Sequence, residues 1–90
     1  MKIKIKESFQ KDLKKIKNRH ILQKTLHLIE VSEFFDATEF WMLYDTKKLK
    51  NSRNFYRIRF WDYRIWFKIE NKELTLIRIK HRRDIYRVFP

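Results

Sequence analysis

Hydrophobic and basic residues alternate through the second half of the chain. The run Tyr56-Arg57-Ile58-Arg59-Phe60 is followed by Tyr63-Arg64-Ile65-Trp66-Phe67-Lys68-Ile69. Because successive side chains of a β-strand point to opposite faces, this period predicts strands with one apolar and one cationic face. Three strands are expected, over about Asn54–Trp61, Tyr63–Glu70 and Glu73–Lys80. Short strands that follow one another in this way favour an antiparallel sheet.

The third of these strands does not alternate cleanly. Leu74 and Leu76 share one parity, but the isoleucines that follow them break it. A β-bulge or a strand buried on both faces would explain this pattern, and both remain open. Glu70-Asn71-Lys72 predicts the preceding turn, with Asn71 in a left-handed conformation.

The first half of the chain predicts a strand and two helices. Met1–Lys6 alternates isoleucine with lysine, Ser8 is a candidate N-cap, and Asn18 to His20 predicts a break before a helix from about Ile21. The inward-facing helical residues are expected to be Phe9, Leu13 and Ile16, then Leu22, Leu26 and Ile29. The segment Phe34–Tyr44 lacks a clear period and predicts an irregular stretch or short helix packed over the core edge, or less readily an exposed partner-binding patch.

Together these elements predict one α+β domain over residues 1–90. A helical hairpin is expected to cover one face of a mostly antiparallel four-stranded sheet that includes Met1–Lys6. The chain has no cysteine and no glycine, which excludes disulfides, thiolate chemistry and glycine-dependent phosphate loops. The absence of disulfides fits a cytoplasmic protein, and no membrane partner is expected, since no apolar run is long enough for a membrane span or resembles a secretion signal.

Positive charge is concentrated after residue 46. This part holds fourteen of the 23 Lys and Arg residues but only four of the 11 Asp and Glu residues, and the formal net charge of the whole chain is +12. Such a charge predicts attraction to nucleic acid, to an anionic membrane or to an acidic protein. Because the arginines are expected to gather on one face of a sheet, a polyanion backbone is the favoured ligand.

Four blocks of residues stand in a distinctive order and spacing: Lys48-Leu49-Lys50, Tyr56-Arg57-Ile58-Arg59, Asp62-Tyr63-Arg64-Ile65 and His81-Arg82-Arg83-Asp84-Ile85-Tyr86. In this order they resemble the RelE/ParE superfamily of toxins from type II toxin–antitoxin modules. The resemblance covers nearly the whole chain. It departs from the family pattern at Asn51 and Trp61, where members usually carry a turn glycine.

The resemblance implies one of two activities. RelE-like members cleave mRNA in the ribosomal A site without a metal ion and are silenced by a co-expressed antitoxin, whereas ParE-like members poison DNA gyrase. The residues that match the nuclease site are Arg57, Arg59, Arg64, Arg82 and Tyr86, with His81 beside them. The sequence is therefore interpreted as a ribosome-dependent mRNA endonuclease. A gyrase inhibitor and a non-catalytic nucleic-acid-binding module remain the alternatives.

RNA can be cut when its own 2′-hydroxyl attacks the adjacent phosphorus. Arginines fixed beside that phosphate would stabilise the charge that develops on its oxygens. His81 and Tyr86 are the candidates for proton transfer, His81 because its ordinary titration range lies near neutrality. No metal ion or other cofactor is expected, since Asp62 and Asp84, the only aspartates after Lys47, do not form a carboxylate cluster. The histidines of the helices are given no role.

The other candidate RNA-binding residues are Lys48, Lys50, Trp66, Lys68 and Arg83. A single basic residue on a sheet is usually just solvated. A set of like charges on one face is more informative, because unpaired like charges repel. Trp66 is expected either to stack on a base or to cover a hydrophobic edge. Tyr56 and Tyr63 have the opposite parity and are expected in the core. The expected protein partner is an antitoxin with an acidic or amphipathic segment that covers the cationic sheet or the helices.

Overall fold

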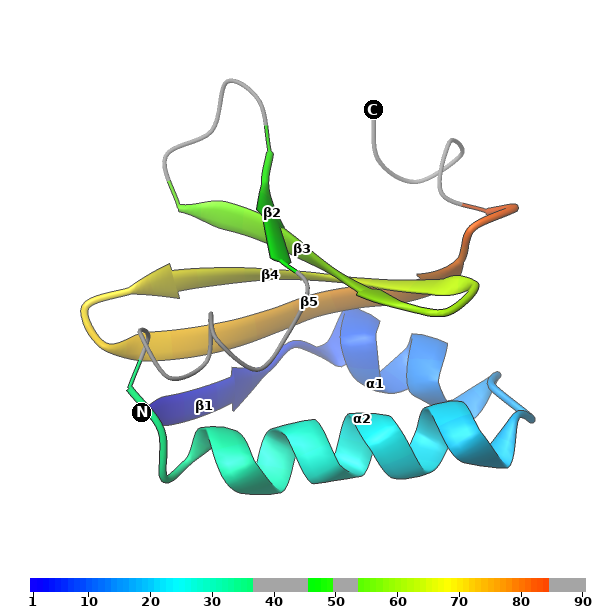
Figure 1. Ribbon diagram of the computed structural model, residues 1–90, viewed down its shortest axis with the longest axis horizontal. Helices are drawn as coiled ribbons and strands as arrows, with labels where there is room; N and C mark the ends of the chain where they lie inside the picture. The colour runs from blue at the N-terminus through cyan, green and yellow to red at the C-terminus, as the bar shows by residue number, and fades with distance from the viewer. Residues whose placement is uncertain (37–45, 50–53, 85–90) are drawn as a thin grey trace.

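The computed structural model describes residues 1–36, 46–49 and 54–84. Within these ranges the elements are β1 (Lys2–Ile5), α1 (Glu7–Lys14), α2 (Arg19–Ser32), β2 (Thr46–Lys48), β3 (Phe55–Phe60), β4 (Tyr63–Glu70) and β5 (Glu73–His81). The strands form one sheet in the order β1-β5-β4-β3-β2, and both helices lie on one side of it (Figure 1). The predicted α+β fold is confirmed. The described sheet has five strands instead of the predicted four, because β2 pairs with β3.

Most of the sheet is antiparallel. β2, β3, β4 and β5 pair with their neighbours in antiparallel register, whereas β1 pairs with β5 in parallel. A parallel pair needs a long connection, and both helices and three strands lie between β1 and β5 in the chain. β1 therefore forms one edge of the sheet and β2 the other.

The core lies between the helices and one face of the sheet. Its fully buried side chains include Phe9, Ile21, Leu28, Ile58, Ile65, Phe67, Leu74, Leu76 and Ile79. Burial of each such side chain contributes about 1.5–3 kcal/mol to folding. Tyr56 and Tyr63 are partly buried against this cluster, as predicted from their parity. The alternation therefore assigns one face of β3 and β4 to the core and leaves the other face to basic residues.

The inward face of α2 differs from the predicted one. The structure buries Ile21, Thr25, Leu28 and Ser32, while Leu26 is 52% exposed. Polar Thr25 and Ser32 are tolerated inside because their hydroxyls donate to the carbonyls of Ile21 and Leu28, four residues earlier. The predicted stripe was therefore wrong at Leu26, and the other two predicted residues, Leu22 and Ile29, are only partly buried.

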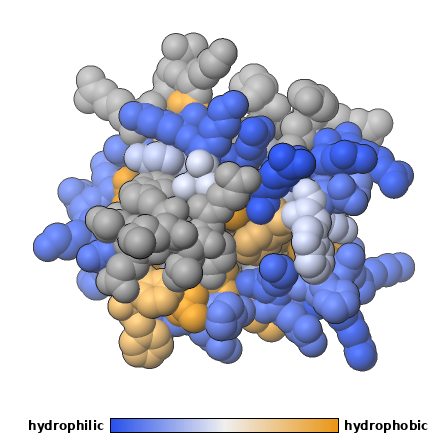
Figure 2. Space-filling model, viewed as in Figure 1, coloured by the Kyte–Doolittle hydropathy of each residue, from blue (hydrophilic) through white to orange (hydrophobic). Residues whose placement is uncertain are grey.

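The start of α2 also differs from the predicted one, since the helix begins at Arg19 and not at about Ile21. Asn18, expected in a break, is the N-cap, and its side-chain oxygen accepts hydrogen bonds from the N–H groups of His20 and Ile21. Phe34, just beyond the helix, is 83% exposed, and Figure 2 shows apolar surface at this end of α2. Residues 37–44 of the predicted irregular segment lie outside the described residues.

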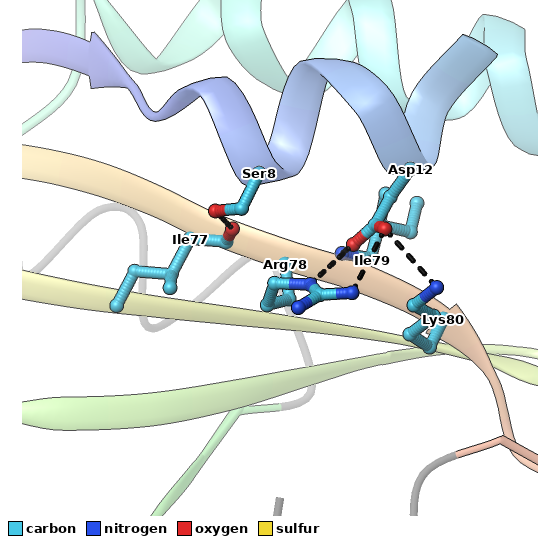
Figure 3. Close-up of polar contacts among 6 residues, drawn as sticks. All are labelled: Ser8, Asp12, Ile77, Arg78, Ile79 and Lys80. Carbon is cyan, nitrogen blue, oxygen red and sulfur yellow. Dashed lines mark hydrogen bonds and ion pairs between the residues drawn. The ribbon is translucent and has the colours of Figure 1, made fainter. Parts of the chain in front are cut away.

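Helix α1 covers the edge of β5 beyond the point where β1 ends. The hydroxyl of Ser8 donates to the carbonyl of Ile77 over 2.6 Å, and the N–H of Ile79 donates to Oδ2 of Asp12 over 3.2 Å (Figure 3). Side chains of the helix thus satisfy strand groups that a neighbouring strand would otherwise pair. The prediction of Ser8 as the N-cap of α1 is wrong. The N-cap is Lys6, whose side chain makes no capping hydrogen bond.

Asp12 is the most constrained charged residue of this contact. Its side chain is 4% exposed and receives hydrogen bonds from Arg78 over 2.7 and 3.1 Å and an ion pair from Lys80 over 3.1 Å. Burial alone raises the pKa of Asp12, but the hydrogen bonds from Arg78, Lys80 and the N–H of Ile79 outweigh it. The pKa of Asp12 therefore lies below its usual value of 3.8, and the carboxylate is charged at neutral pH.

A β-bulge interrupts the pairing of β4 and β5. Trp66 pairs with Arg78 and Phe67 with Leu76, so that Ile77 is the extra residue on β5. The bulge, one of the two explanations left open by the sequence, is the one that the structure adopts. It shifts the parity of β5, so Ile79 lies on the core side with Leu76.

Two tight turns place residues other than glycine in the left-handed region. In the β4–β5 turn Asn71 has φ 53° and Lys72 has φ 62°, as in a type I′ turn. Asn71 was predicted to be left-handed; Lys72 was not. In the β3–β4 turn Trp61 has φ 51°, at a position where glycine is usual in the resembling family.

Replacement of Lys72 by glycine is expected to stabilise the protein. The left-handed conformation is unfavourable for a residue with a Cβ, and Asn-Gly is the preferred pair for this turn, so Lys72→Gly should raise the free energy of unfolding by about 1 kcal/mol. Urea unfolding followed by circular dichroism measures the change. Lys72→Ala is the matched control, since alanine keeps the Cβ and should leave the midpoint nearly unchanged. Equal midpoints for the glycine and alanine variants would contradict the explanation.

Neither helix in the described part of the chain is long and apolar enough to cross a membrane.

Candidate nucleic-acid interface

One row of basic side chains crosses the sheet on the face away from the helices. Arg59, Arg64 and Lys80 lie opposite one another on β3, β4 and β5. Side chains paired in this way have Cβ atoms about 4.5–5.5 Å apart. The adjacent row, Ile58, Ile65 and Ile79, is buried on the helix side. The row therefore brings Arg59 and Arg64 close together on one surface, while the ammonium of Lys80 is paired with Asp12 over 3.1 Å.

A second basic row lies next to the first. It joins Lys47, Arg57, Trp66 and Arg78 across β2 to β5. Trp66 is only 2% exposed, so its ring offers no face to an RNA base. The prediction of Trp66 as an RNA-binding residue is therefore corrected: its neighbours in the row carry charge, but the indole is packed away from solvent. The burial of Trp66 agrees with the other expectation from the sequence, that its ring covers a hydrophobic edge.

Arg64 lies at the centre of the basic face. Its Nη1 donates to the carbonyl of Trp61 over 2.7 Å and to that of Tyr63 over 3.0 Å. Burial lowers the pKa of the Arg64 guanidinium, and the charges of Arg59, Arg57 and Arg82 lower it further. Arg57 and Arg59 from β3 and Arg82 from the residues after β5 are thus close enough to Arg64 for their charges to repel its guanidinium. A bound anion would relieve that repulsion.

Arg82 reaches this group from the end of β5. Its backbone N–H donates to the carbonyl of Asp62 over 2.6 Å, and its Nε lies 3.6 Å from Oδ1 of the same residue. Both side chains are more than half exposed, so this ion pair contributes little to stability. Within the described part of the chain, neither Arg57 nor Arg59 forms an ion pair with a carboxylate. The face is therefore strongly cationic.

His81 does not lie with the arginines. It pairs with Tyr63, and the two rings meet edge to face with centroids 5.2 Å apart, on the side of the sheet that faces the core. Its Nδ1 accepts a hydrogen bond from the N–H of Arg83 over 3.2 Å. The parity shift at the bulge explains this position, because it exchanges the faces on which Lys80 and His81 would otherwise lie.

The other predicted RNA-binding residues are dispersed. Lys48 pairs with Tyr56, so its position belongs to the helix side of the sheet, whereas Lys47 faces Arg57. Lys68 lies in a third row and forms an ion pair with Glu70 over 3.7 Å. Arg83 is exposed. Lys50, Asn51 and Tyr86 lie outside the described residues.

Metal-binding side chains do not gather anywhere in residues 1–36, 46–49 and 54–84, where no three His, Asp or Glu residues are placed to hold an ion. His20, which the sequence left without a role, lies instead against the ring of Trp61 with centroids 5.8 Å apart. The basic groups that the described residues place on this face of β3 and β4 are guanidinium groups and the ammonium of Lys68.

Comparison with known protein families identifies the family of this chain. The sequence matches the family described as "ParE toxin of type II toxin-antitoxin system, parDE" over residues 3–86. The chain belongs to this toxin family. A curated relative, Toxin RelE3 of Methanocaldococcus jannaschii, is 34% identical to it over 90 residues, which is the full length of both chains.

Solved structures place the toxin near the RelE-like members. A chain of the RelB–RelE antitoxin–toxin complex from Methanococcus jannaschii shares 31% identity and has a TM-score of 0.84, with 97% of this chain and 99% of that chain covered. A chain of the archaeal RelE–RelB complex from Pyrococcus horikoshii has a TM-score of 0.71 at 21% identity, over 90% of this chain and 93% of that chain, which shows the shared fold. The protein is thus a RelE-like toxin of a type II toxin–antitoxin system.

Three basic residues on this face of the toxin's sheet were missed by sequence reasoning: Lys47, and also Arg78 and Lys80, whose charges are paired with Asp12. The alternation Ile77-Arg78-Ile79-Lys80 carried a signal, but the bulge hid which face it belonged to. Lys47 was missed because the resemblance drew attention to Lys48, and only the register of β2 on β3 distinguishes the two.

Proposed function

We propose that this toxin is a ribosome-dependent mRNA endonuclease that cuts by attack of a 2′-hydroxyl on the adjacent phosphorus, without a metal ion. The observation that supports it is the placement of Arg57, Arg59 and Arg82 close enough to Arg64 for their charges to act on its guanidinium. Such a cluster is costly in the free protein and is stabilised by a polyanion. It fits a phosphate that gains negative charge during reaction.

The four arginines would have different parts in holding the phosphate. Arg64 is fixed by two carbonyls through Nη1, which leaves its other N–H groups to donate to phosphate oxygens. Arg57 and Arg59 come from the adjacent strand on the same face, and Arg82 from the turn after β5. A fixed donor needs little rearrangement as charge develops, which is the basis of electrostatic catalysis.

Proton transfer is assigned to Tyr86, which matches the family pattern in the sequence. Nearby cations favour the phenolate form of a tyrosine, so a basic site can supply a base without a carboxylate. His81, the other sequence candidate, points to the core side of the sheet beside Tyr63. We therefore favour Tyr86 over His81 for this role.

The proposed partners are the ribosome, its bound mRNA and a cognate antitoxin, all in the cytoplasm. The antitoxin is supported by the relative of 31% identity, which was solved as a RelB–RelE antitoxin–toxin complex. An acidic or amphipathic segment laid over the cationic face or the helices would neutralise the arginines and exclude RNA. Free RNA lacks the positioning that a ribosome would provide, so cleavage is proposed to depend on translation.

Translation of a defined mRNA on purified ribosomes tests this function. Wild-type toxin is expected to produce cuts only when ribosomes are present, at codons where they pause. The downstream fragments should begin with a 5′-hydroxyl, because attack by the 2′-hydroxyl leaves the phosphate on the upstream fragment. Fragment ends are mapped by primer extension, and the 5′-hydroxyl is shown by direct labelling with a polynucleotide kinase. Intact mRNA under these conditions would reject the proposal.

Gyrase inhibition is the second candidate, because the matching family carries the ParE description. ParE-like members are not expected to need an arginine cluster for catalysis. Cells that express such a toxin would show DNA breaks and an SOS response while translation continues. Pulse labelling of protein synthesis beside an SOS reporter separates the two candidates.

A further inference from the structure

The two-residue turn between β3 and β4 holds two of the clustered arginines. The carbonyl of Trp61 accepts a hydrogen bond from Nη1 of Arg64 over 2.7 Å. The carbonyl of Asp62, the next residue, accepts one from the backbone N–H of Arg82 over 2.6 Å. The position of this turn therefore sets where both arginines lie relative to the basic rows on the sheet.

Trp61 has an unusual conformation for its residue type. Its φ is 51°, in the left-handed region, which a large side chain adopts only where the surroundings compensate. The ring supplies a compensating contact with α2. Nζ of Lys24 lies 5.0 Å from the ring centroid, and the ring of His20 meets it edge on, at 72°. The indole thus connects the turn to the first two turns of the helix.

We propose that Trp61 is a positioning residue for Arg64. Its ring, held by Lys24 and His20, fixes the turn, and the carbonyl of the same residue then fixes the guanidinium. A glycine here would adopt the backbone angle more easily but would have no contact with α2. The catalytic consequence rests on the proposed mRNA cleavage; the structural consequence for Arg64 does not.

The ring itself contributes little to the core. It is 55% exposed, so its removal should not unfold the protein, and Trp61→Gly also relieves the left-handed strain. An effect of Trp61→Gly on Arg64 can therefore be distinguished from a loss of folding stability. Phe34→Ala is a matched control, because it removes another exposed aromatic ring at the opposite end of α2, away from Trp61.

Nuclear magnetic resonance of the arginine side chains tests the structural part directly. In wild type, the guanidinium of Arg64 is expected to show slow rotation of its Nη groups, because Nη1 is held by two carbonyls. Trp61→Gly should average these signals, whereas Trp61→Phe, which keeps a ring for Lys24, and Phe34→Ala should not. The Arg64→Lys spectrum assigns the signal. Unchanged Arg64 signals in Trp61→Gly would overturn the proposal, whether or not the toxin cleaves mRNA.

Single-turnover cleavage on ribosomes tests the catalytic part. Trp61→Gly is expected to lower the maximal rate at least tenfold, with the toxin concentration for half-maximal rate changed less than twofold and with recovery in Trp61→Phe. In an Arg64→Ala background Trp61→Gly should have no further effect, since the two residues act as one unit. An equal loss in both backgrounds, or a loss confined to ribosome affinity, would overturn the positioning role. Absence of cleavage by wild type would reject the proposed function, and the spectra would still decide on Trp61.

Discussion

Replacement of Arg64 by alanine is expected to slow ribosome-dependent mRNA cleavage by about 10²–10³-fold, the usual effect of removing one fixed donor to a developing oxyanion. Arg64 lies between Arg59 and Lys80 in the first basic row and is held by the carbonyls of Trp61 and Tyr63. It is the clustered arginine with the lowered pKa, caused first by burial and then by neighbouring arginines. The rate is measured in single turnovers with saturating toxin on mRNA-programmed ribosomes.

Two further variants make this result specific. Arg19→Ala removes an exposed arginine at the start of α2 and changes the net charge equally, so it should cleave at the wild-type rate. Arg64→Lys keeps the charge but loses the fork that can donate to two carbonyls and a phosphate together, and should recover only part of the activity. Full activity in Arg64→Ala, with the same fold by circular dichroism, would contradict the assignment of the site. An equal loss in Arg19→Ala would indicate that net charge alone matters.

The alternation in the second half of the chain made most of the sheet predictable. Period two determines which residues of β3 and β4 face the core, and the strands begin and end close to the predicted positions. The arginines of these strands were therefore assigned to the correct face. Turn chemistry was less predictable, because Lys72 and Trp61 adopt left-handed angles that glycine or asparagine would normally signal.

The position of the basic rows could not be predicted, since it depends on contacts between elements. The bulge at Ile77 places Arg78 and Lys80 on the cationic face and His81 on the core side. Its location is shown by the register of β5 on β4, which no local pattern of the sequence reveals. The same limit applies to α2, where Thr25 and Ser32 count as polar in a sequence but satisfy their hydroxyls within the helix.

Asp12 was also invisible to sequence reasoning, and its replacement is expected to have the largest effect on stability. Asp12→Asn should lower the free energy of unfolding by about 3 kcal/mol, the lower end of the range for removing one partner of a buried ion pair. Arg78 and Lys80 keep some solvent contact, which argues for the lower end. For a domain of this size such a loss corresponds to a melting temperature roughly 12–24 °C lower. Glu7→Gln is the control, because Glu7 pairs with Lys11 on the same helix with both side chains exposed.

The pH dependence distinguishes charge from packing in this contact. Because the pKa of Asp12 is lower in the folded state than its usual 3.8, the ionised carboxylate stabilises the fold above that pH. The wild-type advantage over Asp12→Asn should be complete near neutrality and decrease as pH falls below about 4, until both forms are neutral at this position. Urea unfolding of both proteins between pH 7 and pH 2 measures it. A difference that stays constant into acid would assign the cost to lost shape and hydrogen-bond geometry, and α1 would then hold β5 without help from its charge.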